Sequence, residues 1–313
     1  YLEWRTTTFP HRSERMRAAG RVLRARAGEF AELMATEMGK PLRDGRAEVE
    51  KCAVTCDYYA EHAERMLAPV PAPTEARRSY WVHRPIGVVL AVMPWNFPFW
   101  QVFRFAAPNL MAGNGSLLKH AANVPGCALA IEEVFQEAGF PADVFRTLMI
   151  ETPAVAGVIE DERVRAVTVT GSVRAGKAIA EKAGSLAKKT VLELGGSDPY
   201  LVLADADLDL AVTWTLGSAF SNAGQRCAAG SRILVFDAVY DAFKAKLVAA
   251  TRALKVGTAD TDDYGPVINE EQLTNMLGAV TRASAAGAVV LTGGTRLTGG
   301  AFGGATSWRP LSS

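Results

Sequence analysis

The sequence is poor in cysteine, in long apolar runs and in any excess of one charge sign. Its 313 residues contain four cysteines, and no two of them form a CxxC pair. So few cysteines do not make the disulfide framework of a small secreted protein, and they favour a reducing, cytoplasmic compartment. The longest apolar stretch, residues 86–95, has about ten residues, whereas a membrane-spanning helix needs about 20. The sequence therefore predicts neither a disulfide scaffold nor a membrane protein.

Charge and size restrict the class of protein further. The chain has 34 basic and 33 acidic residues, so no charge excess indicates a nucleic-acid or anionic-membrane surface. Its 49% hydrophobic and 21% charged residues are typical of a globular protein rather than a disordered or fibrous one. Because a single core rarely exceeds about 250–300 residues, we expect two domains.

Hydrophobic periodicity predicts helices at the start of the chain and an alternation of strands and helices after residue 80. Helices are expected over residues 15–38 and 44–65, followed by an extended proline-rich linker at 68–73. Buried strands are expected at 87–93, 116–119, 144–149, 164–170 and 190–194, with helices between them. This alternation is typical of right-handed crossovers and a parallel, doubly wound α/β sheet, which binds ligands beyond the carboxyl ends of its strands.

A second α/β unit follows this sheet. Strands are expected at residues 200–203 and 232–236, and helices at 208–221 and 240–254. We therefore predict an N-terminal domain of helices and parallel sheet over residues 1–194 and a second domain over residues 195–313.

Cys227 has a neighbourhood suited to chemistry. Residues 224–226 are Gly-Gln-Arg, a polar and flexible approach, and a nearby guanidinium favours the thiolate form of a cysteine, which is the nucleophile. A buried structural cysteine is the alternative. The other three cysteines lie on predicted helices among apolar residues, and we interpret them as packing: Cys52, Cys56 and Cys127.

Two polar side chains end or follow predicted strands. Glu193 lies in an apolar strand before two glycines, where a buried carboxylate must be paired or bind a proton more readily, as a general base does. The alternative is an edge-strand glutamate that faces water. Asn96 lies between Pro94 and Pro98, either as a turn residue or as an amide donor to a developing oxyanion.

Other strand ends suggest a cofactor site. Gly171 and Ser172 join a strand to a helix, where exposed N–H groups favour phosphate, although many such turns bind nothing. Lys119 closes another strand, either as a lysine that reaches to solvent or as a ligand of cofactor hydroxyls. No GxGxxG motif is present, so the ordinary dinucleotide fingerprint is excluded.

Four motifs in this order and spacing resemble the aldehyde dehydrogenase superfamily over residues 15 to about 295. They are Pro-Trp-Asn-Phe-Pro at 94–98, Val-Thr-Gly-Ser at 169–172, Leu-Glu-Leu-Gly-Gly at 192–196 and Gly-Gln-Arg-Cys at 224–227. The resemblance implies a Rossmann-type dinucleotide-binding domain and an incomplete catalytic domain. We expect the chain to be C-terminally truncated, and its glycine-rich end after about residue 295 not to be native.

The resemblance also implies roles for single residues. Cys227 matches the nucleophile and Glu193 the general base, while Asn96 and the backbone N–H of Cys227 match the oxyanion hole. Aldehyde oxidation then proceeds through a thioester on Cys227, which an activated water hydrolyses. The positions that match the lining of the dinucleotide site are Trp95, Asn96, Lys119, Ala122, Gly171, Ser172 and Leu194.

Within the superfamily, residues 97–105, 118–121 and 194–199 look most like bacterial succinate-semialdehyde dehydrogenases. Arg104 matches an arginine that holds the far carboxylate of the substrate, and a guanidinium can do so with two hydrogen bonds. A surface arginine is the alternative. Some relatives carry a second arginine where this chain has Ser221, and Arg226 is the candidate to replace it.

The resemblance further implies partners and cofactors. Many NAD-preferring relatives have a glutamate where this chain has Ala122, so we expect NADP to be accepted and NAD also to be used. No metal site is expected, and full-length relatives form homo-oligomers. Two other functions stay open: a dehydrogenase that transfers the acyl group to coenzyme A, which the presence of Glu193 disfavours, and an inactive fragment that only binds a dinucleotide or a partner.

Overall fold

The computed structural model describes residues 1–297 and 311–312 and divides into two compact units. The first unit comprises Tyr1–Leu33 and Gly45–Leu194, and the second comprises Met34–Asp44 and Gly195–Ser313. Each unit is described by itself. The functions expected of the two domains stay predictions.

A five-stranded parallel sheet forms the centre of the first unit. Its order is β5-β4-β3-β6-β7, and all neighbouring strands run parallel. The strands are β3 (Val88–Met93), β4 (Gly115–His120), β5 (Phe145–Thr147), β6 (Val164–Gly171) and β7 (Lys189–Leu194). Central positions such as Leu90 and Val169 are fully buried, which explains their continuous apolar sequences. The parallel α/β fold expected from the sequence is confirmed.

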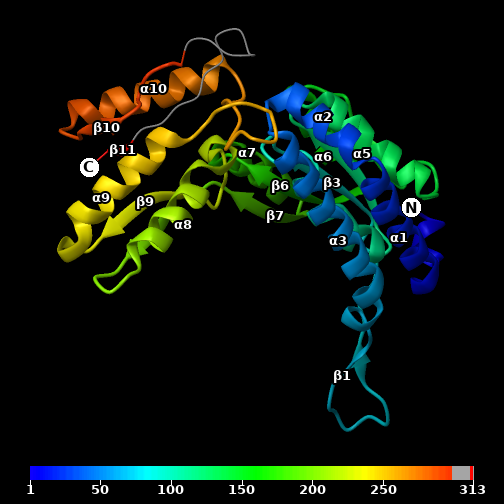
Figure 1. The fold of residues 1–313 in the computed structure, drawn as a ribbon. Coiled ribbons are helices and arrows are strands. Elements are labelled where there is room, and N and C mark those ends of the chain that lie inside the picture. Colours follow the sequence, from blue (N-terminus) through cyan, green and yellow to red (C-terminus); the bar gives the residue numbers. More distant parts are fainter. Residues whose placement is uncertain (298–310, 313) are drawn as a thin grey trace. The chain divides into compact units, whose positions relative to one another are not determined.

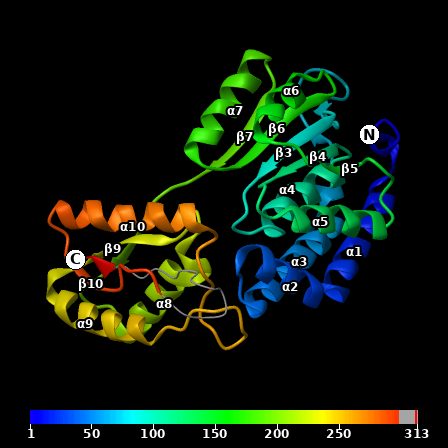
Figure 2. The same cartoon turned by 90° about the horizontal axis from the view of Figure 1, so that it is seen from above.

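Helices cover both faces of this sheet (Figure 2). The crossover helices are α4 (Trp100–Met111), α5 (Pro125–Glu137), α6 (Val155–Glu160), which follows the short helix η2 (Thr152–Ala154), and α7 (Val173–Ser185). Helices α6 and α7 pack on one face, and α4 and α5 pack on the other. Between the latter two, the rings of Phe103 and Phe135 stack with centroids 5.2 Å apart, and Phe145 of β5 extends this aromatic core.

The first predicted helix is two helices. After η1 (Trp4–Thr6), α1 (Phe9–Ala25) ends at Arg26 and α2 (Ala27–Met38) follows. The Arg26 guanidinium binds the carboxylates of Glu29 at 2.6 Å, Glu133 at 3.1 Å and Glu137 at 3.2 Å, the last two on α5. The expectation of one helix over residues 15–38 was wrong at Arg26, where a single residue leaves the helical conformation (φ −106°, ψ 16°).

Helix α3 (Leu42–Met66) leads into a small projecting ribbon (Figure 1). The strands β1 (Val70–Pro71) and β2 (Tyr80–Trp81) pair antiparallel. The segment 68–73, expected to be a plain linker, is thus one arm of a hairpin.

The second unit is built on the parallel pair β8 (Asp198–Val202) and β9 (Gly230–Val235). Its helices are α8 (Leu208–Phe220), the short η3 (Ser221–Gly224), α9 (Asp237–Ala253) and α10 (Glu270–Ala285), the last not anticipated from the sequence. Strand β10 (Val290–Thr292) pairs with β11 (Leu311–Ser312). The core gathers Phe220, Phe243, Tyr264 and Leu273. The tail that we expected not to be native falls largely on residues 298–310 and 313, outside the described residues.

Within residues 1–297 and 311–312, no helix is both long and apolar enough to cross a bilayer.

The second unit contains a close backbone approach that only glycine permits. A Cβ atom added to Gly265 would lie 1.9 Å from the carbonyl oxygen of Gly39. Backbone atoms cannot move aside like a side-chain tip, so Gly265→Ala should destabilise the protein by about 2–3 kcal/mol, the cost of overpacking. Urea unfolding measures this change.

Gly217→Ala is the matched control, since a Cβ at this exposed position of α8 would meet nothing within 4 Å. It should stabilise by up to about 1 kcal/mol through helix propensity. Equal effects of the two substitutions would contradict the packing described for Gly39 and Gly265.

Candidate active site

The carboxyl ends of four parallel strands lie at one edge of the first unit's sheet. Strand pairing places Met93 opposite His120, and Gly171 opposite Leu194. Apart from Arg104, which lies on α4, the predicted site residues of this unit follow or close these strands, as expected for ligand binding in a parallel sheet.

The loop after β3, which carries Asn96, is anchored at two points. His120 Nδ1 accepts a hydrogen bond from the Ala121 N–H at 2.8 Å. The ring proton is therefore on Nε2, which donates to the carbonyl oxygen of Pro98 at 2.9 Å. The imidazole ties the loop to the end of β4. The backbone that carries the half-buried Asn96 is therefore held in place.

The second anchor is Glu48 of α3. Its Oε1 accepts hydrogen bonds from the backbone N–H groups of Phe99 and Trp100, both at 2.9 Å. These two groups belong to the first turn of α4, where N–H groups lack intrahelical partners and a carboxylate is favoured by the helix dipole. Glu48 thus fixes the start of the helix that carries Arg104.

Glu193 is the edge-strand glutamate that the sequence left open as the alternative to a buried carboxylate. Strand β7 is the edge of the described sheet, and the Glu193 side chain is 54% exposed. The interpretation as a buried carboxylate is therefore wrong, and the edge-strand alternative holds. Instead, Glu193 is paired, because its Oε2 lies 3.5 Å from Nη1 of Arg104.

Arg104 connects two strands with α4. Its Nη2 donates to Thr170 Oγ1 at 3.1 Å while Nη1 faces Glu193. Thr170 and Glu193 are register partners on β6 and β7, so the sheet itself sets the spacing of the two groups that Arg104 contacts.

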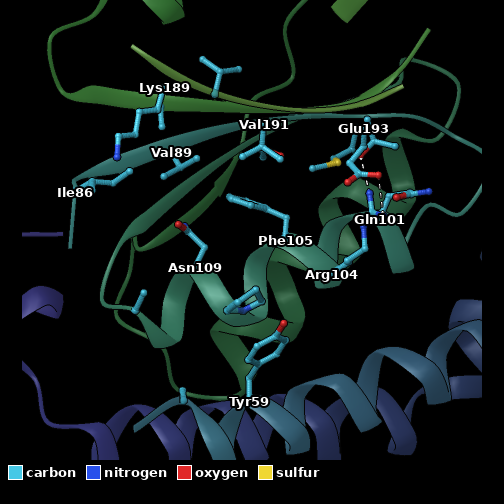
Figure 3. Close-up of a pocket in the computed structure, with 18 of the residues that line it drawn as sticks. Tyr59, Ile86, Val89, Gln101, Arg104, Phe105, Asn109, Lys189, Val191 and Glu193 are labelled. Carbon is cyan, nitrogen blue, oxygen red and sulfur yellow. Dashed lines mark hydrogen bonds and ion pairs between the residues drawn. The ribbon is translucent and has the colours of Figure 1, made fainter. Parts of the chain in front are cut away.

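These three residues line a groove of about 610 Å³ on the α4 face of the sheet (Figure 3). Most of its lining is apolar, and Phe105 and Val191 lie along its length. Gln101, one turn before Arg104 on α4, also lines the groove and is 2% exposed. Its Oε1 is buried without a hydrogen-bond partner among the described residues. The groove therefore combines an apolar wall with a polar cluster, as small-molecule sites do.

The residues expected to bind a dinucleotide lie at the ends of β3, β4, β6 and β7. Lys119 is 8% exposed, and burial lowers the pKa of its ammonium below the usual value. Ala122, two residues after the end of β4, is exposed. Trp95, in the loop after β3, is half-buried.

The strand β6 leads directly into α7. Ser172 caps this helix, since its Oγ accepts from the Ala175 N–H at 3.2 Å. A Cβ on Gly171 would meet nothing within 4 Å, and the first turn of α7 has no acidic residue. The Leu194 side chain packs against Gly176, where a Cβ would lie 2.4 Å from Leu194 Cδ2.

In the second unit, Cys227 follows a left-handed turn. Asn222, Ala223 and Gly224 have φ values of 54°, 55° and 73°. Non-glycine residues in this region cost about 1–3 kcal/mol each, and such strain persists only where the surroundings enforce it. The Cys227 side chain that follows is exposed.

The Gln225 side chain holds this left-handed turn in place. Its Nε2 donates to the carbonyl oxygen of Asn222 at 3.0 Å, and its Oε1 accepts from the Ile268 N–H at 3.0 Å. The amide side chain thereby ties the turn before the cysteine to the segment preceding α10.

The direction of Arg226, which the sequence does not show, is set by Ser221. Arg226 Nη1 donates a short hydrogen bond to Ser221 Oγ. The guanidinium therefore contacts the side chain at the position where some relatives carry an arginine.

The structure brings together part of the predicted site. Arg104, Glu193 and the strand-end residues share the first unit, whereas Cys227 and Arg226 belong to the second. The approach of Cys227 to Asn96 and Glu193 stays a prediction.

Sequence reasoning gave no role to four residues of this site: Glu48, Gln101, His120 and Thr170. His120 and Thr170 are polar residues at the ends of buried strands, which is a usable signal. Glu48 and Gln101 are single polar residues within helices, and nothing in the sequence distinguishes them from surface positions.

Comparison with known proteins identifies the family. A sequence model of the aldehyde dehydrogenase family matches residues 1–306. The NAD(P)+ succinate semialdehyde dehydrogenase Sad of Escherichia coli K12 is 46% identical over 301 residues, covering 96% of this chain and 65% of that protein. The NADP(+) succinate-semialdehyde dehydrogenase of Mycolicibacterium paratuberculosis is 47% identical over 305 residues, with coverages of 96% and 65%.

A solved structure agrees. The succinic semialdehyde dehydrogenase of Streptococcus pyogenes, in complex with NADP+, superposes with a TM-score of 0.94 at 35% identity, covering all of this chain and 68% of that one. The chain belongs to the aldehyde dehydrogenase family. It spans about two thirds of the length of these curated relatives.

The exposure of the four thiols predicts their reactivity. Iodoacetamide applied briefly to the folded protein at neutral pH should label Cys227 first. Cys52, Cys56 and Cys127 are buried, and burial also raises the pKa of the Cys56 thiol, which disfavours its reactive thiolate.

Mass spectrometry of tryptic peptides locates the label, and Cys227→Ser should remove nearly all of it. Labelling of Cys52, Cys56 or Cys127 ahead of Cys227 would contradict the assignment of Cys227 as the accessible thiol.

Proposed function

We propose that this chain carries the nucleophile, the general base and the dinucleotide site of an NAD(P)-dependent aldehyde dehydrogenase acting on succinic semialdehyde or a similar short acidic aldehyde. The observation that carries the proposal is the division of the four thiols. Three are buried, and the exposed one is Cys227, in the motif that the family resemblance assigns to the nucleophile.

The residues at the strand ends suit a dinucleotide. An open position at Gly171, a capped helix without acidic residues in its first turn and the ammonium of Lys119 are compatible with phosphate and ribose groups. Trp95 and Leu194 would line the same site. The cofactor, when bound, supplies the acceptor for the hydride that leaves the substrate carbon.

The protein groups divide the remaining chemistry among them. Cys227 thiolate attacks the aldehyde carbon, while the Asn96 amide and the backbone N–H of Cys227 donate to the oxyanion. After oxidation the substrate is a thioester on Cys227. Glu193 takes a proton from water, the hydroxide adds to the thioester carbon, and the C–S bond breaks to release the carboxylic acid and the thiolate.

Two arginines favour an acidic substrate. Arg104 lies in the groove beside an apolar wall, and a guanidinium binds a carboxylate with two hydrogen bonds. The contact of Arg226 with Ser221 supports Arg226 as the second carboxylate ligand. Relatives named for succinate semialdehyde agree with this substrate class. Homo-oligomerisation, as in full-length family members, stays a prediction.

The presence of Glu193 disfavours the alternative of acyl transfer to coenzyme A, since a thiol acceptor needs no activated water. A fragment that only binds a dinucleotide is the other alternative, and the exposed thiol and the polar cluster in the groove favour an enzyme over it.

Glu193→Gln separates these functions, because it removes the base but leaves the nucleophile. The intact protein should still release one equivalent of reduced dinucleotide per site in a rapid burst. Steady-state turnover should fall by about 10²–10⁴-fold, the usual contribution of general base catalysis. Stopped-flow absorbance measures both phases.

Cys227→Ala should abolish burst and turnover together, and Glu160→Gln, on the exposed Glu160 that pairs with Lys182, should change neither. A Glu193→Gln protein that turns over at the wild-type rate would refute the assigned base.

Ala122→Glu tests the cofactor preference. A glutamate at this exposed position would repel a 2′-phosphate but could accept a hydrogen bond from a 2′-hydroxyl. We expect kcat/KM to shift from NADP towards NAD by about tenfold or more, equivalent to about 1.4 kcal/mol. An unchanged ratio of the two kcat/KM values would show that residue 122 does not contact the ribose.

A further inference from the structure

The Arg104 guanidinium has an anionic partner already in place in the protein. Nη1 lies 3.5 Å from Glu193 Oε2, and Nη2 donates to Thr170 Oγ1 at 3.1 Å (Figure 3). The group proposed to hold the substrate carboxylate therefore contacts the group proposed to activate water. All three residues belong to the first unit.

The ion pair has the properties of an exchangeable contact. The side chains of Arg104 and Glu193 are 35% and 54% exposed, and a single nitrogen approaches a single oxygen at the long distance of 3.5 Å. Partly exposed pairs of this kind stabilise little. A substrate carboxylate that binds the guanidinium with two short hydrogen bonds makes the stronger contact and displaces Glu193.

The groove offers such a carboxylate a place to bind. The polar cluster lies beside an apolar wall that includes Phe105 and Val191. The carboxylate would accept hydrogen bonds from the Arg104 guanidinium, while the carbon chain of the substrate packs against the apolar wall.

Thr170 determines where the guanidinium lies. It is 8% exposed and fixed in β6 directly opposite Glu193. The hydrogen bond to its hydroxyl holds one side of the Arg104 guanidinium, so that the other side faces Glu193. Thr170 is thus a positioning residue that acts through Arg104.

We propose that Arg104 exchanges Glu193 for the far carboxylate of the substrate, and that this exchange releases Glu193 for thioester hydrolysis. The Glu193 oxygen that accepts from the guanidinium is engaged by Arg104 and is not available to accept a proton from water. When an acidic acyl group on Cys227 takes Arg104, Glu193 is freed, takes a proton from water and lets the resulting hydroxide break the C–S bond. With an uncharged acyl group, Arg104 stays on Glu193 and hydrolysis is slow. This inference rests on the proposed function.

The test is the hydrolysis of an uncharged acyl group on Cys227, which needs no dinucleotide. p-Nitrophenyl acetate acetylates the thiol with a burst of p-nitrophenolate, and the following steady state reports hydrolysis. Arg104→Gln should accelerate this steady state in the intact protein by about three- to fivefold, the factor that corresponds to losing an ion pair of this exposure. The same substitution should raise KM for succinic semialdehyde.

Variants of Thr170 separate positioning from folding. Thr170→Val should also accelerate acetyl hydrolysis, and Thr170→Ser, which keeps the hydroxyl, should restore the wild-type rate. Thr190→Val on β7 is the control, since Thr190 lies outside the groove and its hydroxyl makes no hydrogen bond within the described part of the chain, and its rate should equal the wild type.

The outcomes distinguish this inference from the proposed function. If the wild type gives no burst, or Cys227→Ala keeps it, the proposed function itself fails. If the burst is present but Arg104→Gln leaves acetyl hydrolysis unchanged or slower, only the exchange at Arg104 is overturned.

Discussion

The parallel register of β3, β4, β6 and β7 is the constraint on which the rest of the site depends. It places Met93 beside His120 and Thr170 beside Glu193, so that loops from distant parts of the sequence begin at one edge of the sheet. No local motif could assemble these groups. Each loop is then fixed by its own contact: the His120 imidazole for the Asn96 loop, and the Ser172 cap for α7.

Much of the fold could be predicted from hydrophobic pattern alone. The strands of the main sheet and most of the helices appear within a few residues of their expected bounds, because buried parallel strands are short continuous apolar runs between helices. The break at Arg26 could not be predicted, because it is confined to one residue and the helical spacing of apolar residues continues through it. The pairing of Val70 with Trp81 was hidden for a similar reason, since proline-rich sequence resembles a linker.

The candidate site shows the same limit more sharply. Motifs single out Cys227, Glu193 and Asn96, but burial cannot be read from a strand sequence. Glu193 lies on the edge strand, so it is half-exposed and paired rather than desolvated. The residues that set its surroundings, Thr170 and Arg104, become related only through sheet register. The Arg104 guanidinium lies between the Thr170 hydroxyl and the Glu193 carboxylate, and the proposed exchange at Arg104 rests on these contacts.

The central claim is that a thiol on the second unit works with an amide and a carboxylate on the first. A crystal structure of the intact protein with an acyl group on Cys227 measures this directly. The account predicts the Asn96 Nδ2 atom within about 3 Å of the acyl oxygen, and the Glu193 carboxylate within reach of a water beside the thioester carbon. An acyl group remote from both Asn96 and Glu193 would contradict it.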